Sequence, residues 1–243
     1  AGLGSLVMDV KLGNGAFMAG LAEARALAHS IVDVAAGAGL PCRALITDMN
    51  QVLGHTAGNA LEVRESIDFL TGAAQEPRLL ELTLALAAQM LHGAGLATTP
   101  ADGRAQAAAA LHSGRAAEHF ARMVAGLGGP ADVLAAARLP AAPVQRAVPA
   151  PRGGMLAAMG TRALGLAVVA LGGGRARASD VVDPRVGFSH VRPLGATVQA
   201  GDALLLVHAA SAADADAACV AVLAAITIAD TAPPPGPVVI EAL

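Results

Sequence analysis

The chain has 243 residues, of which 55% are hydrophobic and only 14% are charged. The formal net charge at pH 7 is −3 and the basic residues are scattered arginines, so the basic surface of a nucleic-acid-binding protein is missing. Uncharged stretches such as residues 163–174 and 217–229 are shorter than the roughly 18–20 apolar residues that span a bilayer, so we expect no membrane partner either.

The first part of the chain predicts two strand–loop–helix units. Residues 5–11 form a short apolar run that predicts a strand, and a glycine loop at residues 13–15 leads into a helical pattern over 20–38. A second strand is predicted at residues 42–47, followed by a loop over 48–57. Alternating strands and helices indicate an α/β fold with a mostly parallel sheet, whose ligands bind in loops beyond the carboxyl ends of the strands.

A helix is predicted to start at Asn59, because Glu62 follows at the spacing of a capping box. Successive short helices are expected from Pro77 to Leu139, with Pro77, Pro100 and Pro130 in their first turns. A proline-rich stretch then predicts a boundary near residue 140. Residues 1–140 would form a partial α/β domain, a mixed sheet with a helical layer, and residues 141–243 a C-terminal α+β domain.

The C-terminal region mixes short strands and helices. Residues 144–148 read as a strand, and residues 152–154 predict a hairpin turn into a further strand at 155–159. A helix over 161–171 is expected to end at the glycines at 172–174. The alternative is a phosphate-binding glycine loop, which is less favoured because these glycines follow a helix instead of opening one. The remaining expected elements are strands at 186–191, 204–208 and 238–241, and a helix over 212–229.

Three motif blocks occur in order along the chain. The first is LVMDVKLGNGAFM at residues 6–18, and the second joins ITDMNQVLG at 46–54 to GNALEVRE at 58–65. The third joins TRALG at 161–165 to GGGR at 172–175, with Asp180 and VGF at 186–188. Together these blocks closely resemble the thymidine and pyrimidine nucleoside phosphorylase family, and they span nearly the whole chain.

The resemblance implies a pentosyltransferase of nucleoside salvage that uses no organic cofactor. Phosphate would attack the anomeric carbon of thymidine or another pyrimidine nucleoside, which releases the base and a (deoxy)ribose 1-phosphate. In the family a helical domain and an α/β domain close on each other, and complete members dimerise chiefly through the helical domain. The residues present do not discriminate between thymidine and broader pyrimidine specificity.

The family's phosphate loop and its Arg, Ser and Lys base ligands have no counterpart in this sequence. Its only lysine, Lys11, belongs to a different motif. The start of the chain resembles the point just after the family backbone returns from the helical domain to the α/β domain. We therefore expect a fragment with no catalytic residue of its own, inactive without an N-terminal segment or a partner chain. The alternative is a noncatalytic relic or assembly module that keeps the fold.

Four residues are carried over from the family as site residues. Phe17 matches the apolar residue that lies over the pyrimidine pocket, and the alternative is a core Phe after a glycine loop. Leu53, Thr56 and Glu65 match positions that bind K⁺ in some bacterial members, through two backbone carbonyls and one carboxylate. All-oxygen ligation suits such a hard cation. Alternatively, Glu65 is a solvated helix residue.

Several other features favour a structural reading. Asp9 and Lys11 point to one face of their strand, which predicts a local ion pair or a support for the neighbouring loop. Residues 194–205 resemble the hammerhead fold of biotinyl and lipoyl carriers, but they lack the lysine that such carriers modify. The seven His form no catalytic grouping, and only His55 falls in a ligand-facing loop.

The sequence indicates a cytoplasmic location. The start of the chain has no basic segment followed by an apolar run and a cleavage site, which is the pattern of a secretory signal. Cys42 and Cys219 have neither metal-binding nor redox spacing, so we expect two buried, reduced thiols.

Overall fold

The computed structural model describes residues 2–135, 139–234 and 236–243. They form two compact units. Among the described residues, the first unit comprises 2–49, 69–134 and 236–243, and the second comprises 50–68, 135 and 139–234. The long segment of the second unit begins close to the expected boundary at residue 140. A single cut does not describe the division, however, because residues 50–68 join the second unit and residues 236–243 join the first.

The first unit is built on a three-stranded mixed sheet with the order β1–β2–β9. The parallel pair β1 (Leu6–Leu12) and β2 (Cys42–Asp48) confirms the expected strands and their direction. The last strand, β9 (Val239–Ala242), is also confirmed and pairs antiparallel with β2. This long-range pairing brings the C-terminal segment into the first unit.

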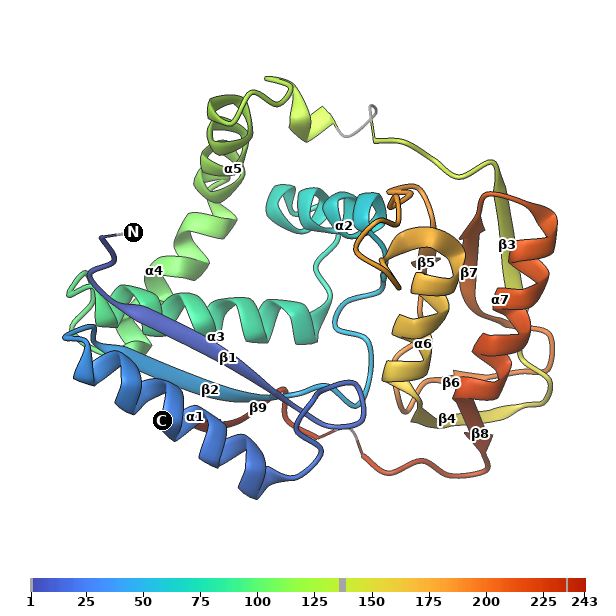
Figure 1. The fold of residues 1–243 in the computed structure, drawn as a ribbon, viewed down its shortest axis with the longest axis horizontal. Coiled ribbons are helices and arrows are strands. Elements are labelled where there is room, and N and C mark those ends of the chain that lie inside the picture. Colours follow the sequence, from blue (N-terminus) through green and yellow to red (C-terminus); the bar gives the residue numbers. More distant parts are fainter. Residues whose placement is uncertain (1, 136–138, 235) are drawn as a thin grey trace. The chain divides into compact units, whose positions relative to one another are not determined.

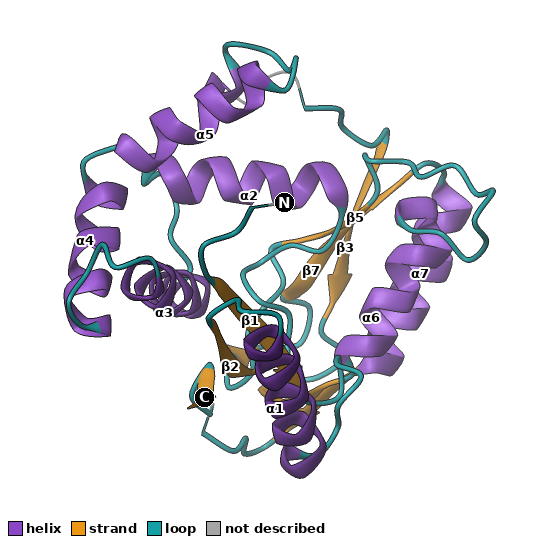
Figure 2. Ribbon diagram, turned by 60° about the vertical axis from the view of Figure 1, so that its left-hand side comes forward, coloured by secondary structure: helices purple, strands orange, loops and turns teal. Residues whose placement is uncertain are grey.

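Helices cover both faces of this sheet (Figure 2). Helix α1 (Leu21–Gly37) packs its buried Ala24 and Ala28 against Val10, Ala44 and Ile46. Helix α3 (Pro77–Gly93) lies on the opposite face, where Gly93 approaches the side chain of Arg43. The small alanine side chains on α1 allow its backbone to lie close to the strands, and this explains how an alanine-rich chain forms a core.

Helices α4 (Pro100–His112) and α5 (Arg115–Gly126) also belong to the first unit. The short 3-10 turn η1 (Val133–Ala135) falls where the sequence passes from the first unit to the second. Pro77 and Pro100 start α3 and α4 as expected, with Glu76 and Thr99 accepting hydrogen bonds from the amides of Leu79 and Asp102. No helix starts at Pro130 among the described residues, so that prediction is wrong. The end of the expected helical region, residues 136–138, lies outside the described residues.

Helix α2 (Asn59–Thr71) starts where the sequence predicts, but its cap lies one residue earlier. The Glu62 carboxylate accepts a hydrogen bond from the backbone amide of Gly58 at 2.9 Å. The Asn59 side chain donates instead to the carbonyl of Gly173 at 3.1 Å. The expected Asn59–Glu62 capping box is therefore wrong, because the Asn59 amide group binds another segment of the second unit.

The second unit contains two small antiparallel sheets (Figure 1). One has the order β3–β7–β5, formed by Val144–Pro149, Ala203–Ala209 and Gly187–Ser189. The other has the order β6–β4–β8, formed by Thr197–Val198, Gly154–Met159 and Ile226–Ala229. Helix α6 (Thr161–Val168), its π-helical extension η2 (Val169–Gly173) and helix α7 (Ala212–Ala225) pack beside each other. Leu156, Leu164 and Phe188 are among the most deeply buried residues in the core of the second unit.

Two expectations for this unit are wrong. Strands β3 and β4 do not form a hairpin, because β3 pairs with β7 whereas β4 pairs with β6 and β8. The expected helix over 212–229 ends at Ala225, and residues 226–229 form β8. The β-branched Ile226, Thr227 and Ile228 favour a strand over a helix at that point. The described helices include none that is long and apolar enough to cross a membrane.

The close contact of α3 with α4 generates a stability prediction. A Cβ atom built on Gly103 would lie 2.7 Å from the carbonyl oxygen of Ala88, which is backbone and cannot move aside cheaply. We expect Gly103→Ala to lower the free energy of unfolding by about 1–3 kcal/mol. The measurement is urea denaturation followed by circular dichroism.

Gly165 in α6 provides the matched control, because a Cβ there would meet nothing within 4 Å. Gly165→Ala should raise the free energy of unfolding by roughly 0.5–1 kcal/mol, since alanine is the better helix former. Equal effects of the two substitutions would argue against the close approach of α4 to α3.

Candidate functional site

The carboxyl ends of β1 and β2 carry a short, internally bonded loop. The amide of Gly13 donates to the carbonyl of Met18 at 3.1 Å, and the amide of Gly15 donates to the carbonyl of Met49 at 3.0 Å. Phe17 lies in this loop and is 94% exposed. The reading of Phe17 as a core residue is therefore wrong, and a loop held in this way presents its ring to solvent.

Asp9, Lys11 and Thr47 form a polar cluster near the same strand ends. Lys11 Nζ lies 2.7 Å from Asp9 Oδ2, which confirms the expected local ion pair. The hydroxyl of Thr47 donates to Asp9 Oδ1 at 2.5 Å, so both carboxylate oxygens have a partner. Thr47 is buried and lies opposite Lys11 in the register of the parallel pair. The cluster thus fixes Lys11 beside the loop that carries Phe17.

A second ion pair at this end of the sheet joins three segments of the first unit. Arg78 Nη2 lies 2.7 Å from Asp48 Oδ2, and Arg78 Nη1 donates to the carbonyl of Gly236 at 3.2 Å. The side chains of Arg78 and Asp48 are only 15% and 13% exposed. This contact between α3, β2 and the C-terminal segment could not be predicted, because the partners are 30 and 158 residues apart.

The loop that follows β2 folds around the carboxylate of Glu65 on α2. Glu65 Oε1 accepts a hydrogen bond from the His55 amide at 2.5 Å, and Glu65 Oε2 accepts one from the Thr56 hydroxyl at 2.5 Å. Gly54 has a left-handed φ of 74°, and a Cβ atom there would lie 2.6 Å from the carboxylate. Only glycine therefore allows the carboxylate to approach the loop backbone so closely.

The structure brings together two of the four expected site residues, Thr56 and Glu65. Leu53 lies partly buried in the same loop, which we call the 53–57 loop. Phe17 belongs to the first unit and these three residues to the second. Among the described residues no group of three or more His, Cys, Asp and Glu could hold a metal ion. A cation at this loop would therefore rely on one carboxylate and backbone oxygens, a donor set that suits K⁺ better than a transition metal.

The 53–57 loop is attached to the C-terminal part of the second unit by paired backbone groups. The amide of Ala57 donates to the carbonyl of Phe188 at 3.0 Å, and the amide of Phe188 donates back at 2.8 Å. The amide of Val191 also donates to the carbonyl of His55 at 3.0 Å. Just before the loop, the buried Gln51 accepts a hydrogen bond from the amide of Leu194 at 3.0 Å. These bonds place the loop backbone independently of its side chains.

Three other sequence candidates have structural roles. His55 Nδ1 lies 3.3 Å from the carbonyl of Val191, as expected for a histidine that supports the loop. Gly172 has a φ of 92° at the end of η2, which confirms that the triple glycine ends the helix. Cys42 and Cys219 are both free but only partly buried, so the expectation that both thiols are buried is wrong. Partial burial raises the pKa of both thiols.

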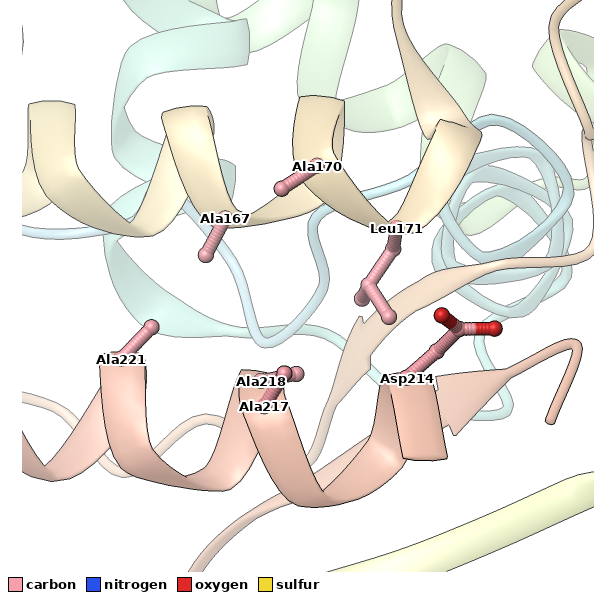
Figure 3. Close-up of a pocket in the computed structure, with 7 residues that line it drawn as sticks. All are labelled: Ala167, Ala170, Leu171, Asp214, Ala217, Ala218 and Ala221. Carbon is pink, nitrogen blue, oxygen red and sulfur yellow. The ribbon is translucent and has the colours of Figure 1, made fainter. Parts of the chain in front are cut away.

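A shallow groove between α6–η2 and α7 offers no catalytic group (Figure 3). Apart from Asp214 its lining is apolar and mostly alanine, with Ala167, Ala170, Leu171, Ala217, Ala218 and Ala221. Asp214 accepts a hydrogen bond from the Ser211 hydroxyl at 2.6 Å at the start of α7. The carboxylate thus takes part in capping the helix.

Comparisons with known proteins support one family over both parts of the chain. Residues 1–117 match the model of the glycosyl transferase family a/b domain, and residues 155–229 match that of the pyrimidine nucleoside phosphorylase C-terminal domain. A thymidine phosphorylase of Mesorhizobium japonicum is 54% identical over 235 residues, and one of Agrobacterium fabrum is 52% identical over 235 residues. Each alignment covers 96% of this chain but 54% of the relative, so the chain spans about half the length of these relatives.

The paired oxygens of Glu65 generate a prediction for the 53–57 loop. Glu65→Gln keeps the shape of the side chain but leaves one acceptor oxygen for two donors. We expect the free energy of unfolding to fall by about 1–2 kcal/mol and the His55 amide to exchange faster with solvent. Urea denaturation and amide hydrogen exchange measure the two effects.

Glu118→Gln on the exposed face of α5 is the control and should change stability by less than about 0.5 kcal/mol. The importance of the Glu65 contacts would be refuted by a Glu65→Gln protein with wild-type stability and wild-type exchange at His55.

Proposed function

Because the chain belongs to the thymidine phosphorylase family, a pentosyltransferase family, we propose that it is part of an enzyme that phosphorolyses thymidine or related pyrimidine nucleosides. In this reaction phosphate oxygen forms a bond to the anomeric carbon while the bond from that carbon to the base nitrogen breaks. The base leaves with a proton, and the sugar becomes a 1-phosphate. The identity of 54% over 96% of the chain with the Mesorhizobium japonicum thymidine phosphorylase carries this proposal.

The first unit suits a substrate-closing role in this reaction. Its parallel strands end at the loop that holds Phe17, and such strand ends are where open α/β sheets bind ligands. The exposed ring of Phe17 would pack on one face of the pyrimidine and exclude water from it. Lys11, paired with Asp9 at the end of β1, would support the base of the loop. It would take no part in the making or breaking of bonds.

We assign no catalytic group to these 243 residues and propose that alone they do not turn over substrate. An enzyme that binds phosphate and a pyrimidine needs several cationic or hydrogen-bonding groups around them. The only lysine of the chain is neutralised by Asp9 at 2.7 Å. The relatives are about twice as long as the matched region, and their remaining part would supply the missing groups, either as a segment or as a partner chain.

We further propose that the 53–57 loop binds K⁺ in the complete enzyme. Leu53 and Thr56 would contribute backbone carbonyls and Glu65 a carboxylate oxygen. The contacts of Glu65 with His55 and Thr56 support this assignment, because they bring the carboxylate to the loop that carries both carbonyls. A bound cation would hold this loop in one conformation, and it would not react itself.

A cytoplasmic location accompanies this proposal, since the two cysteines of the chain are free and disulfides are rare in that compartment. The alternative function, a noncatalytic relic or assembly module, keeps the same fold.

A complementation assay tests the proposed reaction. The part of the Mesorhizobium japonicum relative outside the matched residues is produced separately and mixed with this chain, and thymine release from thymidine and phosphate is followed by absorbance. We expect turnover from the mixture and none from either part.

In the mixture, Phe17→Ala should raise KM for thymidine about tenfold, because the pyrimidine loses its contact with one aromatic face. The free energy of unfolding should not change. A mixture that forms a stable complex but releases no thymine would favour the noncatalytic alternative, and turnover by this chain alone would refute the need for a second part.

The same mixture tests the cation. Replacing K⁺ by Na⁺ at equal ionic strength should slow thymine release several-fold, because the smaller ion fits a carbonyl-lined site less well. Glu65→Gln should remove most of this difference. A rate that is the same in both salts would contradict the K⁺ proposal while leaving the phosphorolysis assignment intact.

A further inference from the structure

A buried serine lies between two histidines in the second unit, at the turn that contacts the 53–57 loop. Ser189 Oγ, at the end of β5, lies 2.7 Å from Nε2 of His208 on β7 and 2.9 Å from Nδ1 of His190. Ser189 and His208 are only 6% and 7% exposed, whereas His190 is exposed. Ser189 has one hydroxyl proton and two lone pairs, so it can donate to at most one of the two rings and accepts an N–H hydrogen bond from at least one of them.

The backbone at His190 is unusual. Its φ of 55° is the only positive value among the described residues other than glycine. A side chain in this left-handed conformation is strained, and such strain persists only where surrounding contacts impose it. The bond from the His190 ring to Ser189 is one contact that holds the turn. Burial, and secondarily the neighbouring His190, lower the pKa of His208, which favours the neutral form of its ring.

The strained turn directly precedes one of the bonds to the 53–57 loop. Phe188, just before Ser189, exchanges two backbone bonds with Ala57. Val191, just after His190, donates to the carbonyl of His55. The left-handed residue between them redirects the chain so that both of these contacts form on one loop. Without the turn, an extended chain would carry Val191 away from His55.

We infer that Ser189, His190 and His208 are positioning residues for the 53–57 loop. Ser189 links the strained turn to the rigid strand β7, and the turn holds the backbone of His55 to Ala57. Because Thr56 lies between these two anchored residues, the cluster sets the direction of the Thr56 carbonyl. This inference rests on the proposed function only in treating the 53–57 loop as a ligand loop. The positioning of the loop backbone does not depend on that function.

Substitution of the exposed His190 separates the effect of backbone strain at this position from the effect of losing the ring contact with Ser189. His190→Ala removes the ring but keeps the strained conformation, so the turn should open more often. We expect exchange at the Ala57 and Val191 amides to become about tenfold faster, as for the loss of one hydrogen bond. His190→Gly also removes the ring but adopts positive φ without strain, so exchange there should stay within about twofold of wild type. The internal control is the amide of Leu156 on β4, which donates to the carbonyl of Ala196, and its exchange rate should not change.

Substitution of Ser189 completes the test by amide hydrogen exchange in the full chain. Ser189→Ala should accelerate the same two amides about tenfold in the wild-type background but only about twofold in the His190→Gly background. Ser189→Thr, which keeps the hydroxyl, should restore protection. The positioning role is overturned if His190→Ala and His190→Gly exchange alike, or if Ser189→Ala has the same effect in both backgrounds. Because the exchange is measured without substrate or K⁺, failure of the phosphorolysis or cation proposal would leave this result unaffected.

Discussion

The second unit depends on a short backbone bridge between Ala57 and Phe188, two residues 131 positions apart in the chain. Two reciprocal hydrogen bonds of 3.0 and 2.8 Å join them, and they extend the β3–β7–β5 sheet by one more paired segment. Two glycines make this approach possible, because a Cβ atom on Gly58 would lie 2.5 Å from the carbonyl of Val186, and one on Gly187 would strike Ala57. The bridge explains why residues 50–68 fold with a sequence-distant region.

Each candidate ligand loop is held by the unit to which it belongs. In the first unit, backbone bonds within residues 13–18 and to Met49 hold the loop that exposes the Phe17 ring. In the second, Glu65 closes the 53–57 loop on one side and the His190 turn holds it on the other. Charged residues are scarce, and Asp9, Lys11 and Arg78 each form an ion pair that fixes a backbone segment. These two ion pairs lie near the carboxyl ends of β1 and β2.

Local patterns in the sequence predicted much of the first unit. The apolar runs and glycine loops identified β1 and β2, and the alternation of strand and helix gave their parallel direction, because both signals depend on nearby residues. The Asp9–Lys11 ion pair followed from the two-residue period of a strand. The motif that contains Glu65 identified a candidate ligand, but its contact with the His55 amide could not be predicted, since it depends on a loop conformation set by Gly54.

Pairings between distant segments were the main source of error. The expected hairpin failed because β3 pairs with β7, which follows more than fifty residues later, and no local signal distinguishes that partner from β4. The sequence predicts too long a helix for α7, because the alanine-rich residues 217–225 lead without a break into the β-branched residues of β8. The Ser189–His208 contact could not be predicted either, since it depends on the long-range pairing of β5 with β7. A search for polar residues on paired short strands would find it once the register is known.

The central claim is that the 53–57 loop, fixed by Glu65 and by the His190 turn, is a functional cation-binding loop. The most direct measurement is anomalous diffraction from crystals of the complemented enzyme grown in Rb⁺, which replaces K⁺. The account predicts an anomalous peak within coordination distance of the Leu53 and Thr56 carbonyls and the Glu65 carboxylate, and no such peak in Glu65→Gln crystals. A well-ordered loop without an anomalous peak in the wild-type crystals would contradict it.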